Sequence, residues 1–278
     1  MKPPFPYFGG KQTMARLIVS MLPDHKHYVE PFAGSLAVLL AKPTSPVETI
    51  NDLDSSLVTF WRVLRDREEE LARAVELTPH AREEGNLSRA QTYVPGDELE
   101  TARRVWVCLT QGRGSNLGDP GTGWRYASAP SYGSAAKNLD GYRSRMPACA
   151  RRIAHVSLEN RPAVEVIAEY GQHAEALLYV DPPYVFSTRT KQKVKRYGHE
   201  MTDADHRQLA EALRQASAAV VLSGYPSPLY EELYDGWHRT ELSASTSNGG
   251  ERRARTEVLW SNVPLGAQGD LFDMADVA

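Results

Sequence analysis

The chain has 278 residues, of which 41% are hydrophobic and 24% charged, so it can form one large α/β domain with an insertion or two modest domains. Its formal net charge of −3 argues against indiscriminate coating of nucleic acid, so DNA binding would depend on a local basic patch. No apolar run is long enough to cross a bilayer, and the first residues lack the apolar stretch of a signal peptide. We therefore expect a cytoplasmic protein without a membrane partner.

The first part of the chain alternates between helical and strand patterns. Apolar residues recur at helical spacing behind a capping threonine, and short apolar runs alternate with these segments. A glycine-containing turn at 31–35 separates the first predicted strand from the second predicted helix. In chain order, the pattern predicts a helix at 13–22, a strand at 27–30, a helix at 36–41, a strand at 47–50 and helical residues from 57 to 77.

Residues 78–150 interrupt this alternation. Polar helical stretches flank a segment at 111–142 that is rich in Gly, Ser, Asn and aromatic residues, a composition that excludes a core strand. A second α/β run follows, with strands predicted at 152–158, 176–180, 219–223, 237–242 and 255–260, helices at 163–170 and 202–216, and a loose tail at 266–278.

Two α/β halves around an interruption predict one doubly wound sheet. In such sheets the ligand binds beyond the carboxyl ends of the strands, at the point where the strand order reverses. The most distinctive motifs of the chain fall on predicted strand ends, where Asp52 follows the second strand and Asp181 follows the strand at 176–180. We therefore expect the ligand site at that edge of the sheet.

The tetrapeptide Asp181-Pro182-Pro183-Tyr184 carries the strongest chemical signal. Proline alone would simply end a strand, but here a carboxylate precedes the two prolines and an aromatic ring follows them. The exocyclic amine of adenine has a lone pair delocalised into the ring, and two acceptors on its hydrogens concentrate that pair on nitrogen. Asp181 and the Pro182 carbonyl are suitable acceptors, and Tyr184 can stack on an extruded base.

With this motif, the chain resembles the Dam-like, or D12, class of adenine-N6 DNA methyltransferases, in which Asp-Pro-Pro-Tyr is the catalytic motif. The segment Pro6–Lys11 (PYFGGK) is similar to the opening element of that family, beside the cofactor. The segment Val29–Ser35 (VEPFAGS) is similar to its first cofactor motif. The segment Arg255–Asn262 resembles its closing strand, and we interpret that segment as mostly structural.

This resemblance implies a Rossmann-like class I methyltransferase that depends on S-adenosyl-L-methionine (SAM). The implied fold is a seven-stranded, mostly parallel sheet with a helical target-recognition insertion. The division that it implies is a catalytic core at 1–59 and 151–265, an inserted target-recognition domain at 60–150 and a flexible tail at 266–278.

The same resemblance implies which residues hold SAM. Asp52 fits the acidic residue that accepts the ribose hydroxyls of a nucleoside cofactor, and Asp54 competes with it for this role and for the N-cap of the next helix. Leu36 stands where a second glycine is often found, and Asn160 lies where the family places a residue near the cofactor adenine. The implied cofactor-binding residues are Tyr7, Lys11, Glu30, Phe32, Gly34, Ser35, Asp52, Asn160 and Asp181.

Two segments are predicted to contact double-stranded DNA. The segment from Gln111 to Tyr126 resembles the target-recognition insertion of this class. In it, Arg113 and Arg125 could reach phosphates or guanine edges and Asn116 could read a base edge, while a solvated surface loop is the alternative interpretation. A basic run after the catalytic motif is predicted to clamp phosphates and consists of Arg189, Lys191, Lys193, Lys195 and Arg196.

The predicted reaction is methyl transfer from SAM to N6 of a flipped adenine in DNA. No metal is required, because the sulfonium is already an activated donor, and Cys108 and Cys149 are expected to be inert thiols. Cytosine-N4 methylation is the nearest alternative, although that class often has Ser in place of the leading Asp. A protein that binds DNA without turnover is the alternative from another class. A monomer would suffice, because each DNA strand can be methylated in a separate event.

Overall fold

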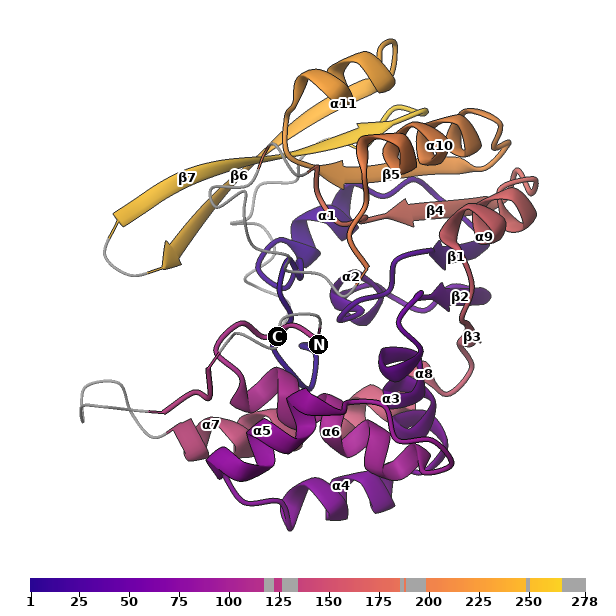
Figure 1. Cartoon of the computed structure of the whole chain (residues 1–278). Helices are drawn as coiled ribbons and strands as arrows, with labels where there is room; N and C mark the ends of the chain where they lie inside the picture. Colours follow the sequence, from indigo (N-terminus) through magenta and orange to yellow (C-terminus); the bar gives the residue numbers. More distant parts are fainter. Residues whose placement is uncertain (118–122, 127–134, 186–187, 189–198, 249–250, 267–278) are drawn as a thin grey trace, which may run out of the picture.

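The computed structural model of the chain describes residues 1–117, 123–126, 135–185, 188, 199–248 and 251–266. A β-sheet flanked by helices forms the upper part of the view in Figure 1, and a group of helices lies below it. We call this lower group, the described residues between 55 and 153, the helical lobe. It contains α3 (Ser55–Asp66), α4 (Glu68–Glu76), α5 (Arg82–Ala90), α6 (Glu98–Gln111), α7 (Ala135–Arg143) and α8 (Met146–Ile153). The predicted basic run (Arg189, Lys191, Lys193, Lys195 and Arg196) and the tail from residue 267 lie outside the described residues.

The described strands form one seven-stranded sheet in the order β3-β2-β1-β4-β5-β7-β6. The first five strands in this order pair in parallel, and β7 is antiparallel to both β5 and β6. The order reverses between β1 and β4, so the predicted doubly wound, mostly parallel sheet is confirmed. The strands are β1 (His27–Glu30), β2 (Val47–Asn51), β3 (Ser157–Glu159), β4 (Ala176–Val180), β5 (Ala219–Gly224), β6 (His238–Asn248) and β7 (Glu251–Ser261).

Apolar clusters lie on both faces of the sheet. All five residues of β4 are buried, as expected for a parallel strand between two helical layers. Leu177 and Tyr179 belong to one cluster, and Leu178 and Val180 to the other, because side chains alternate along a strand. The first cluster includes α1 (Ala15–Met21) and α2 (Ala37–Ala41), and the second includes α9 (Ala163–Tyr170), α10 (Asp203–Arg214) and α11 (Pro228–Leu233). None of the helices in the described part is both long and apolar enough to span a bilayer.

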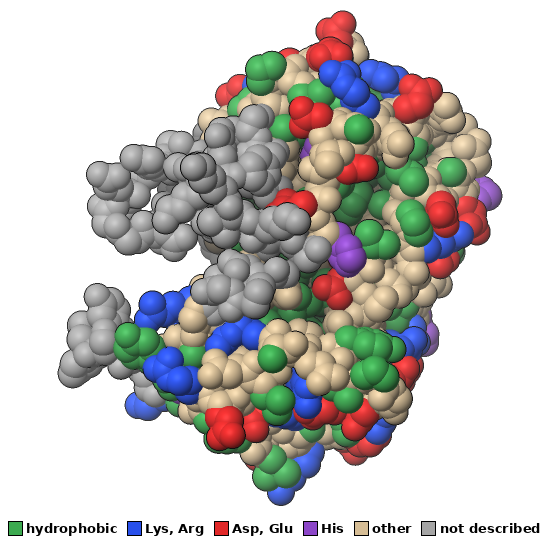
Figure 2. Space-filling view, viewed as in Figure 1, with side chains coloured by type: hydrophobic (Ala, Val, Ile, Leu, Met, Phe, Trp, Pro, Cys, Tyr) green, Lys and Arg blue, Asp and Glu red, His purple; other side chains and the backbone are tan. Residues whose placement is uncertain are grey.

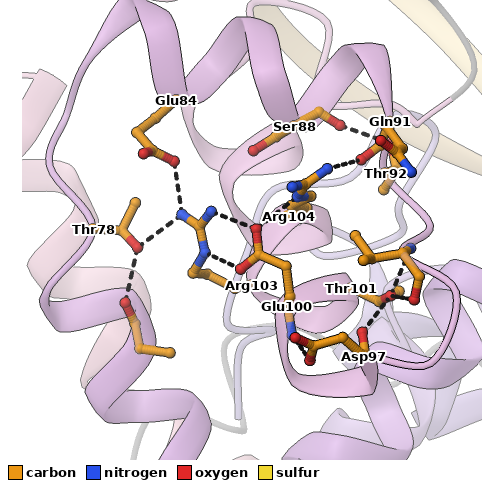
Figure 3. Close-up of polar contacts among 12 residues, drawn as sticks. Thr78, Glu84, Ser88, Gln91, Thr92, Asp97, Glu100, Thr101, Arg103 and Arg104 are labelled. Carbon is orange, nitrogen blue, oxygen red and sulfur yellow. Dashed lines mark hydrogen bonds and ion pairs between the residues drawn. The ribbon is translucent and has the colours of Figure 1, made fainter.

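Partly buried polar contacts hold the helical lobe together. Arg103 of α6 donates hydrogen bonds to Glu100 of its own helix, to Glu84 of α5 and to the hydroxyl of Thr78 (Figure 3). The Arg103 side chain is only 14% exposed and binds both carboxylates. Charge-assisted contacts of this kind are stronger than those of an exposed ion pair, so they fix α5 against α6.

The N-terminal segment, residues 1–8, is bound to the helical lobe. The Trp106 indole of α6 donates to the carbonyl of Pro4 at 3.0 Å, and Arg145 donates to the carbonyl of Pro3 at 3.0 Å. The backbone N–H of Phe8 donates to the carbonyl of Ser115 at 2.8 Å. These bonds attach the segment that leads to Lys11 to the lobe.

The third predicted strand is largely wrong. Helix α8 continues to Ile153, and only Ser157–Glu159 form β3 where a strand was expected at 152–158. Met146, Cys149 and Ile153 lie at helical spacing and are buried, so the apolar positions before β3 belong to a helix face. The strand prediction failed because a short apolar run does not distinguish the helical period of about 3.6 residues from the strand period of 2.

Other elements also differ from the prediction. The helical residues at 57–77 divide at Arg67 into α3 and α4. Helix α11 has no predicted counterpart, because its six residues are too few to show a helical period; Ser227 caps it by accepting a hydrogen bond from the Tyr230 N–H. Strands β6 and β7 contain 11 residues each and extend beyond the predicted segments at 237–242 and 255–260.

Candidate active site

A cavity of about 390 Å³ lies at the carboxyl ends of β1 and β4, where the strand order reverses. Figure 2 shows a hollow between the sheet half and the helical lobe, with acidic and histidine side chains along it. The position of the cavity agrees with the expectation for a doubly wound sheet. The predicted site residues that line it are Tyr7, Lys11, Glu30, Phe32, Gly34, Ser35, Asp52, Asp181, Pro182 and Pro183.

Asp181 lies one residue beyond β4 and is contacted by two donors. The Ser223 hydroxyl donates to its Oδ1 at 2.8 Å, and Lys11 Nζ donates to the same oxygen at 2.5 Å. The Tyr179 hydroxyl donates in turn to Ser223 Oγ at 3.4 Å. Ser223 belongs to β5 and was not among the predicted site residues, since a serine at the end of a strand has no distinctive signal.

Lys11 lies between two carboxylates. Its Nζ is 2.5 Å from Asp181 Oδ1 and 3.5 Å from Glu257 Oε1, and its side chain is 4% exposed. Burial lowers the pKa of Lys11, but the two carboxylates outweigh burial and raise this pKa above its ordinary value. Burial raises the pKa of Glu257, and the Lys11 ammonium opposes that rise. Glu257, in the strand interpreted as structural, is therefore also part of the site.

The Tyr184 ring does not line the cavity. Tyr184 is 6% exposed, and its hydroxyl donates to Glu257. Lys11 Nζ lies over the ring, 4.7 Å from its centroid, and Tyr225 packs edge-on with ring centroids 4.6 Å apart. The ammonium group therefore covers one face of Tyr184, and a base could stack on that face only after Lys11 moves.

The turn after β1 brings backbone close to the cavity. Gly34 has a φ of 47°, and a Cβ at this position would lie 3.2 Å from Cε1 of Tyr7. Leu36 also has a positive φ, 55°, although its side chain is fully buried. The left-handed conformation costs a non-glycine residue about 1–2 kcal/mol, a strain that burial of the leucine side chain offsets. Leu36 thus has the backbone conformation that a glycine would adopt.

Asp52 and Asp54 have different roles. Asp54 is the N-cap of α3, and its side chain accepts from the N–H groups of Ser56 and Leu57. Asp52 lines the cavity and accepts from the N–H groups of Gly34 and Asp54, each at 3.0 Å. Burial raises the pKa of Asp52 to about 6, although these backbone donors oppose the rise. A half-buried carboxylate that faces a cavity is a suitable acceptor for ligand hydroxyls.

Glu30 ends β1, lines the cavity and is 2% exposed. The Tyr28 hydroxyl donates to Oε1 at 2.5 Å, and the Leu39 N–H donates to the same oxygen at 3.0 Å. Burial raises the pKa of Glu30 to about 8, against the effect of these donors. A carboxyl group with this pKa can ionise when a cation enters the cavity.

Asn160 does not line the cavity. Its side-chain amide donates to the Asp52 carbonyl at 2.7 Å, and its Oδ1 accepts from the Ser55 hydroxyl at 2.8 Å. Its contact with a cofactor therefore stays a prediction. Residues at the starts of α9 and α10 line this part of the cavity instead, and their types give no sequence signal of a cofactor: Pro162, Ala163, Val164, His199, Glu200, Met201, Asp205, Gln208 and Leu209.

Of the three DNA-contacting residues predicted in the helical lobe, Arg113 alone is exposed. Its guanidinium lies 4.8 Å from the centroid of the Tyr126 ring. Arg125 is half-buried and donates to the Ser115 hydroxyl at 3.1 Å. Asn116 is 7% exposed, so it does not present a side chain to solvent in this structure.

Arg113 belongs to a row of stacked rings and guanidinium groups that we call the stacked platform: His80, Arg82, Arg113, Trp124 and Tyr126. The rings of His80 and Trp124 stack with centroids 4.5 Å apart, and those of Trp124 and Tyr126 with centroids 6.1 Å apart. The Arg82 guanidinium lies 5.0 Å from the Trp124 centroid. In Figure 2, Lys and Arg side chains gather where the lobe borders the hollow.

Within the described ranges, no group of three or more His, Cys, Asp and Glu side chains could hold a metal ion. Cys108 and Cys149 are buried free thiols. Burial raises the pKa of each to about 11, which makes them poor nucleophiles near neutral pH, as expected from the sequence.

A known protein family and a curated relative each match most of the chain. Residues 7–99 and 132–248 match the family described as D12 class N6 adenine-specific DNA methyltransferase. The chain is also similar to the Type II methyltransferase M1.LlaDCHI of Lactococcus lactis subsp. cremoris. The two are 25% identical over 297 residues, which cover 94% of this chain and 95% of that protein. The matched family residues include Lys11, Glu30, Asp52 and Asp181.

Proposed function

The chain belongs to the D12 class N6 adenine-specific DNA methyltransferase family, and from this premise we propose how its cavity methylates adenine N6 in DNA. We propose that the methyl donor is SAM and that the helical lobe selects the target in double-stranded DNA. The observation that carries the proposal is one cavity lined by Glu30 and Asp52 and by the first three residues of the catalytic motif, Asp181, Pro182 and Pro183. A Type II modification role, as named for the Lactococcus relative, is part of the proposal.

The residues around the cavity fit SAM. The volume, about 390 Å³, is within the usual range for small-molecule sites, roughly 300–1,000 Å³. Asp52 would accept the ribose hydroxyls, and Glu30 would pair with a cationic group of the cofactor. Gly34 permits close approach of the backbone. Tyr7, Phe32 and Ser35 would complete the cofactor-binding surface. Asn160 lies outside the cavity and would contribute through its hydrogen bond to the Asp52 carbonyl.

The chain's own residues prepare the target amine. When bound, SAM supplies a methyl group already activated on a sulfonium. The Asp181 carboxylate and the Pro182 carbonyl would each accept one hydrogen of the amine, and the proline ring fixes the direction of that carbonyl. Transfer forms the N6–C bond from the amine lone pair and leaves the electrons of the broken C–S bond on sulfur. The amine proton that is lost passes to Asp181 or to water.

The base must leave the duplex to reach Asp181, as in other enzymes that act on bases. Tyr184 would stack on the extruded adenine, and Lys11 would leave the ring face as the base arrives. Glu257 contacts both Lys11 and the Tyr184 hydroxyl, so it would retain both groups near the site during this exchange.

The stacked platform is proposed to contact DNA. Tyr126 is 48% exposed, and Arg82 and Arg113, whose guanidinium groups lie over its ring, supply charge for phosphates or guanine edges. A guanidinium already held over a ring loses little freedom when it makes a bidentate contact. The contacts of Arg103 fix α5, which carries Arg82, so the platform is held in place before DNA binds. On this proposal residues 60–150 select the target, residues 1–59 and 151–265 perform the transfer, and the run at 189–196 clamps phosphates.

The pKa of Asp52 predicts that SAM binding weakens in acid. Asp52 is ionised above about pH 6 in the free protein, and only the ionised form offers all its lone pairs to ribose hydroxyls. Below that pH, binding must first remove a proton, so the Kd for SAM should rise by up to about tenfold per pH unit. Titration calorimetry at several pH values on either side of the pKa of about 6 measures the slope of log Kd against pH. Asp52→Asn should bind weakly and lose the part of the slope that begins below about pH 6, while Glu30, whose pKa is about 8, can contribute a slope in both proteins. An unchanged slope in this variant would assign the titration to another group.

The test of the function is to identify the methylated base. The purified protein is incubated with methyl-labelled SAM and unmethylated DNA of varied sequence, and the digested nucleosides are identified by mass. N6-methyladenine is the expected product. N4-methylcytosine would keep the fold and the amine chemistry but overturn the substrate. Absence of label in DNA, together with absence of SAM binding, would favour a DNA-binding protein without turnover.

A further inference from the structure

Ser223 lies beside the proposed catalytic carboxylate, on the neighbouring strand. In the parallel pair β4–β5, Val180 is opposite Leu222, so Asp181 and Ser223 are the next residues along the same register. Ser223 is fully buried, and its hydroxyl donates to Asp181 Oδ1 at 2.8 Å. The sheet thus supplies a neutral donor that the Asp-Pro-Pro-Tyr motif does not contain.

Both donors to Asp181 bind the same oxygen. Lys11 reaches Oδ1 from the N-terminal segment, and Ser223 reaches it from β5. In the part of the chain that the structure describes, no residue donates a hydrogen bond to Oδ2. The terminal torsion of an aspartate is broad, so a carboxylate without fixed partners would sample several orientations. Two donors on one oxygen restrict that torsion and leave the other oxygen for a ligand.

The two donors are not equivalent. The Lys11 ammonium also covers the Tyr184 ring and contacts Glu257, so the arrival of a base at that ring would displace it from its present position. Ser223 is on a central strand, and its hydroxyl bonds to Asp181 and to the Tyr179 hydroxyl, both on the neighbouring strand β4 or directly after it. It can therefore keep Oδ1 occupied during the whole reaction.

We propose that Ser223 is a positioning residue for methyl transfer, which holds Asp181 Oδ1 so that Oδ2 accepts a hydrogen of the adenine amine. This proposal rests on the function proposed above for Asp181. Ser223 acts through Asp181 and does not touch the substrate. Misplacement of a reacting group by about 1 Å can cost on the order of 100-fold in rate, so a single buried hydroxyl is sufficient for a measurable effect.

The test compares two buried serines on neighbouring strands. Ser261 of β7 is also fully buried, but its hydroxyl donates to the Val220 carbonyl at 2.7 Å. Ser223→Ala should lower the single-turnover rate constant about 10- to 100-fold, with the Kd values for SAM and DNA unchanged. Ser261→Ala should keep the wild-type rate constant. Ser223→Thr retains the hydroxyl and should recover most of the rate.

Two results would overturn the positioning role. One is a Ser223→Ala variant with the wild-type rate constant; the other is a rate loss matched by equal losses in SAM binding or in thermal stability beyond those of Ser261→Ala. Failure of the underlying function has a different signature. If Asp181→Ala retained turnover, the proposed role of Asp181 would fail. If Asp181→Ala were inactive but Ser223→Ala kept the wild-type rate constant, only the proposed role of Ser223 would fail.

Discussion

Asp181→Ala is expected to lower the rate of adenine methylation about 1,000-fold or more while DNA binding and SAM binding persist. The variant removes the acceptor that concentrates the amine lone pair, but it leaves the cavity residues Glu30 and Asp52 in place. It also leaves Lys11 paired with Glu257, so no buried ammonium loses its last carboxylate. Single-turnover transfer of labelled methyl at saturating DNA, beside a gel-shift measurement of DNA affinity, separates the two effects.

Variants of the stacked platform provide a control in which DNA binding, and not the rate of methyl transfer, is expected to change. Arg82→Ala and Tyr126→Ala alter exposed side chains of the helical lobe and leave Asp181 untouched. They should weaken DNA binding and keep the rate of transfer once DNA saturates the protein. Retained turnover in Asp181→Ala would contradict the proposed chemistry, and unchanged DNA affinity in both platform variants would contradict the proposed DNA surface.

Lys11→Met is expected to lower the free energy of unfolding by about 3–5 kcal/mol, because it removes the cation from a buried ion pair. The Glu257 side chain is 5% exposed and would lose its counter-ion, while Asp181 is 19% exposed and keeps the Ser223 hydroxyl. Burial already raises the pKa of Glu257 above its unfolded value. The folded variant therefore takes up a proton more readily than the unfolded chain, and its loss of stability should shrink as the pH falls. Urea unfolding at several pH values measures both effects.

The matching control also removes the Glu257 carboxylate, which has lost its counter-ion in Lys11→Met. Lys11→Met combined with Glu257→Gln should recover much of the stability, because the neutral amide can still accept from the Tyr184 hydroxyl without a counter-ion. Losses that simply add in the double variant would mean that the two residues act independently and would contradict the ion-pair explanation.

Local sequence pattern was sufficient for the parts of the site that are contiguous in the chain. The fully buried run of β4 and the motif after it identify Asp181 without knowledge of the fold, since a parallel central strand is apolar throughout. Asp52 was likewise identified from its place after a strand. Geometry assigns the N-cap of α3 to Asp54, whose side chain accepts from Ser56 and Leu57, while the ribose-binding role of Asp52 stays a proposal.

The contacts around Asp181 depend instead on the order of strands, which no local pattern contains. Lys11 and Asp181 are 170 residues apart, and Tyr184 and Glu257 are 73 apart. Ser223 reaches Asp181 because β5 pairs with β4, and Glu257 reaches Lys11 because β7 pairs with β5. A serine and a glutamate at strand positions have many possible roles, so the sequence could not distinguish these two from structural residues.

The attachment of the N-terminal segment to the helical lobe sets the order in which the protein can assemble during synthesis. The carbonyl of Pro4 is bound by Trp106, 102 residues later in the chain, and Lys11 is held by Asp181. A ribosome releases residues from the N-terminus onward, and long-range contacts form only when both partners have emerged. Pro4 and Lys11 are therefore fixed only after Trp106 and Asp181, which follow them in the chain, have emerged. The cavity is incomplete until Asp181, Pro182 and Pro183 have left the exit tunnel, so a nascent chain stalled in the helical lobe lacks part of its lining.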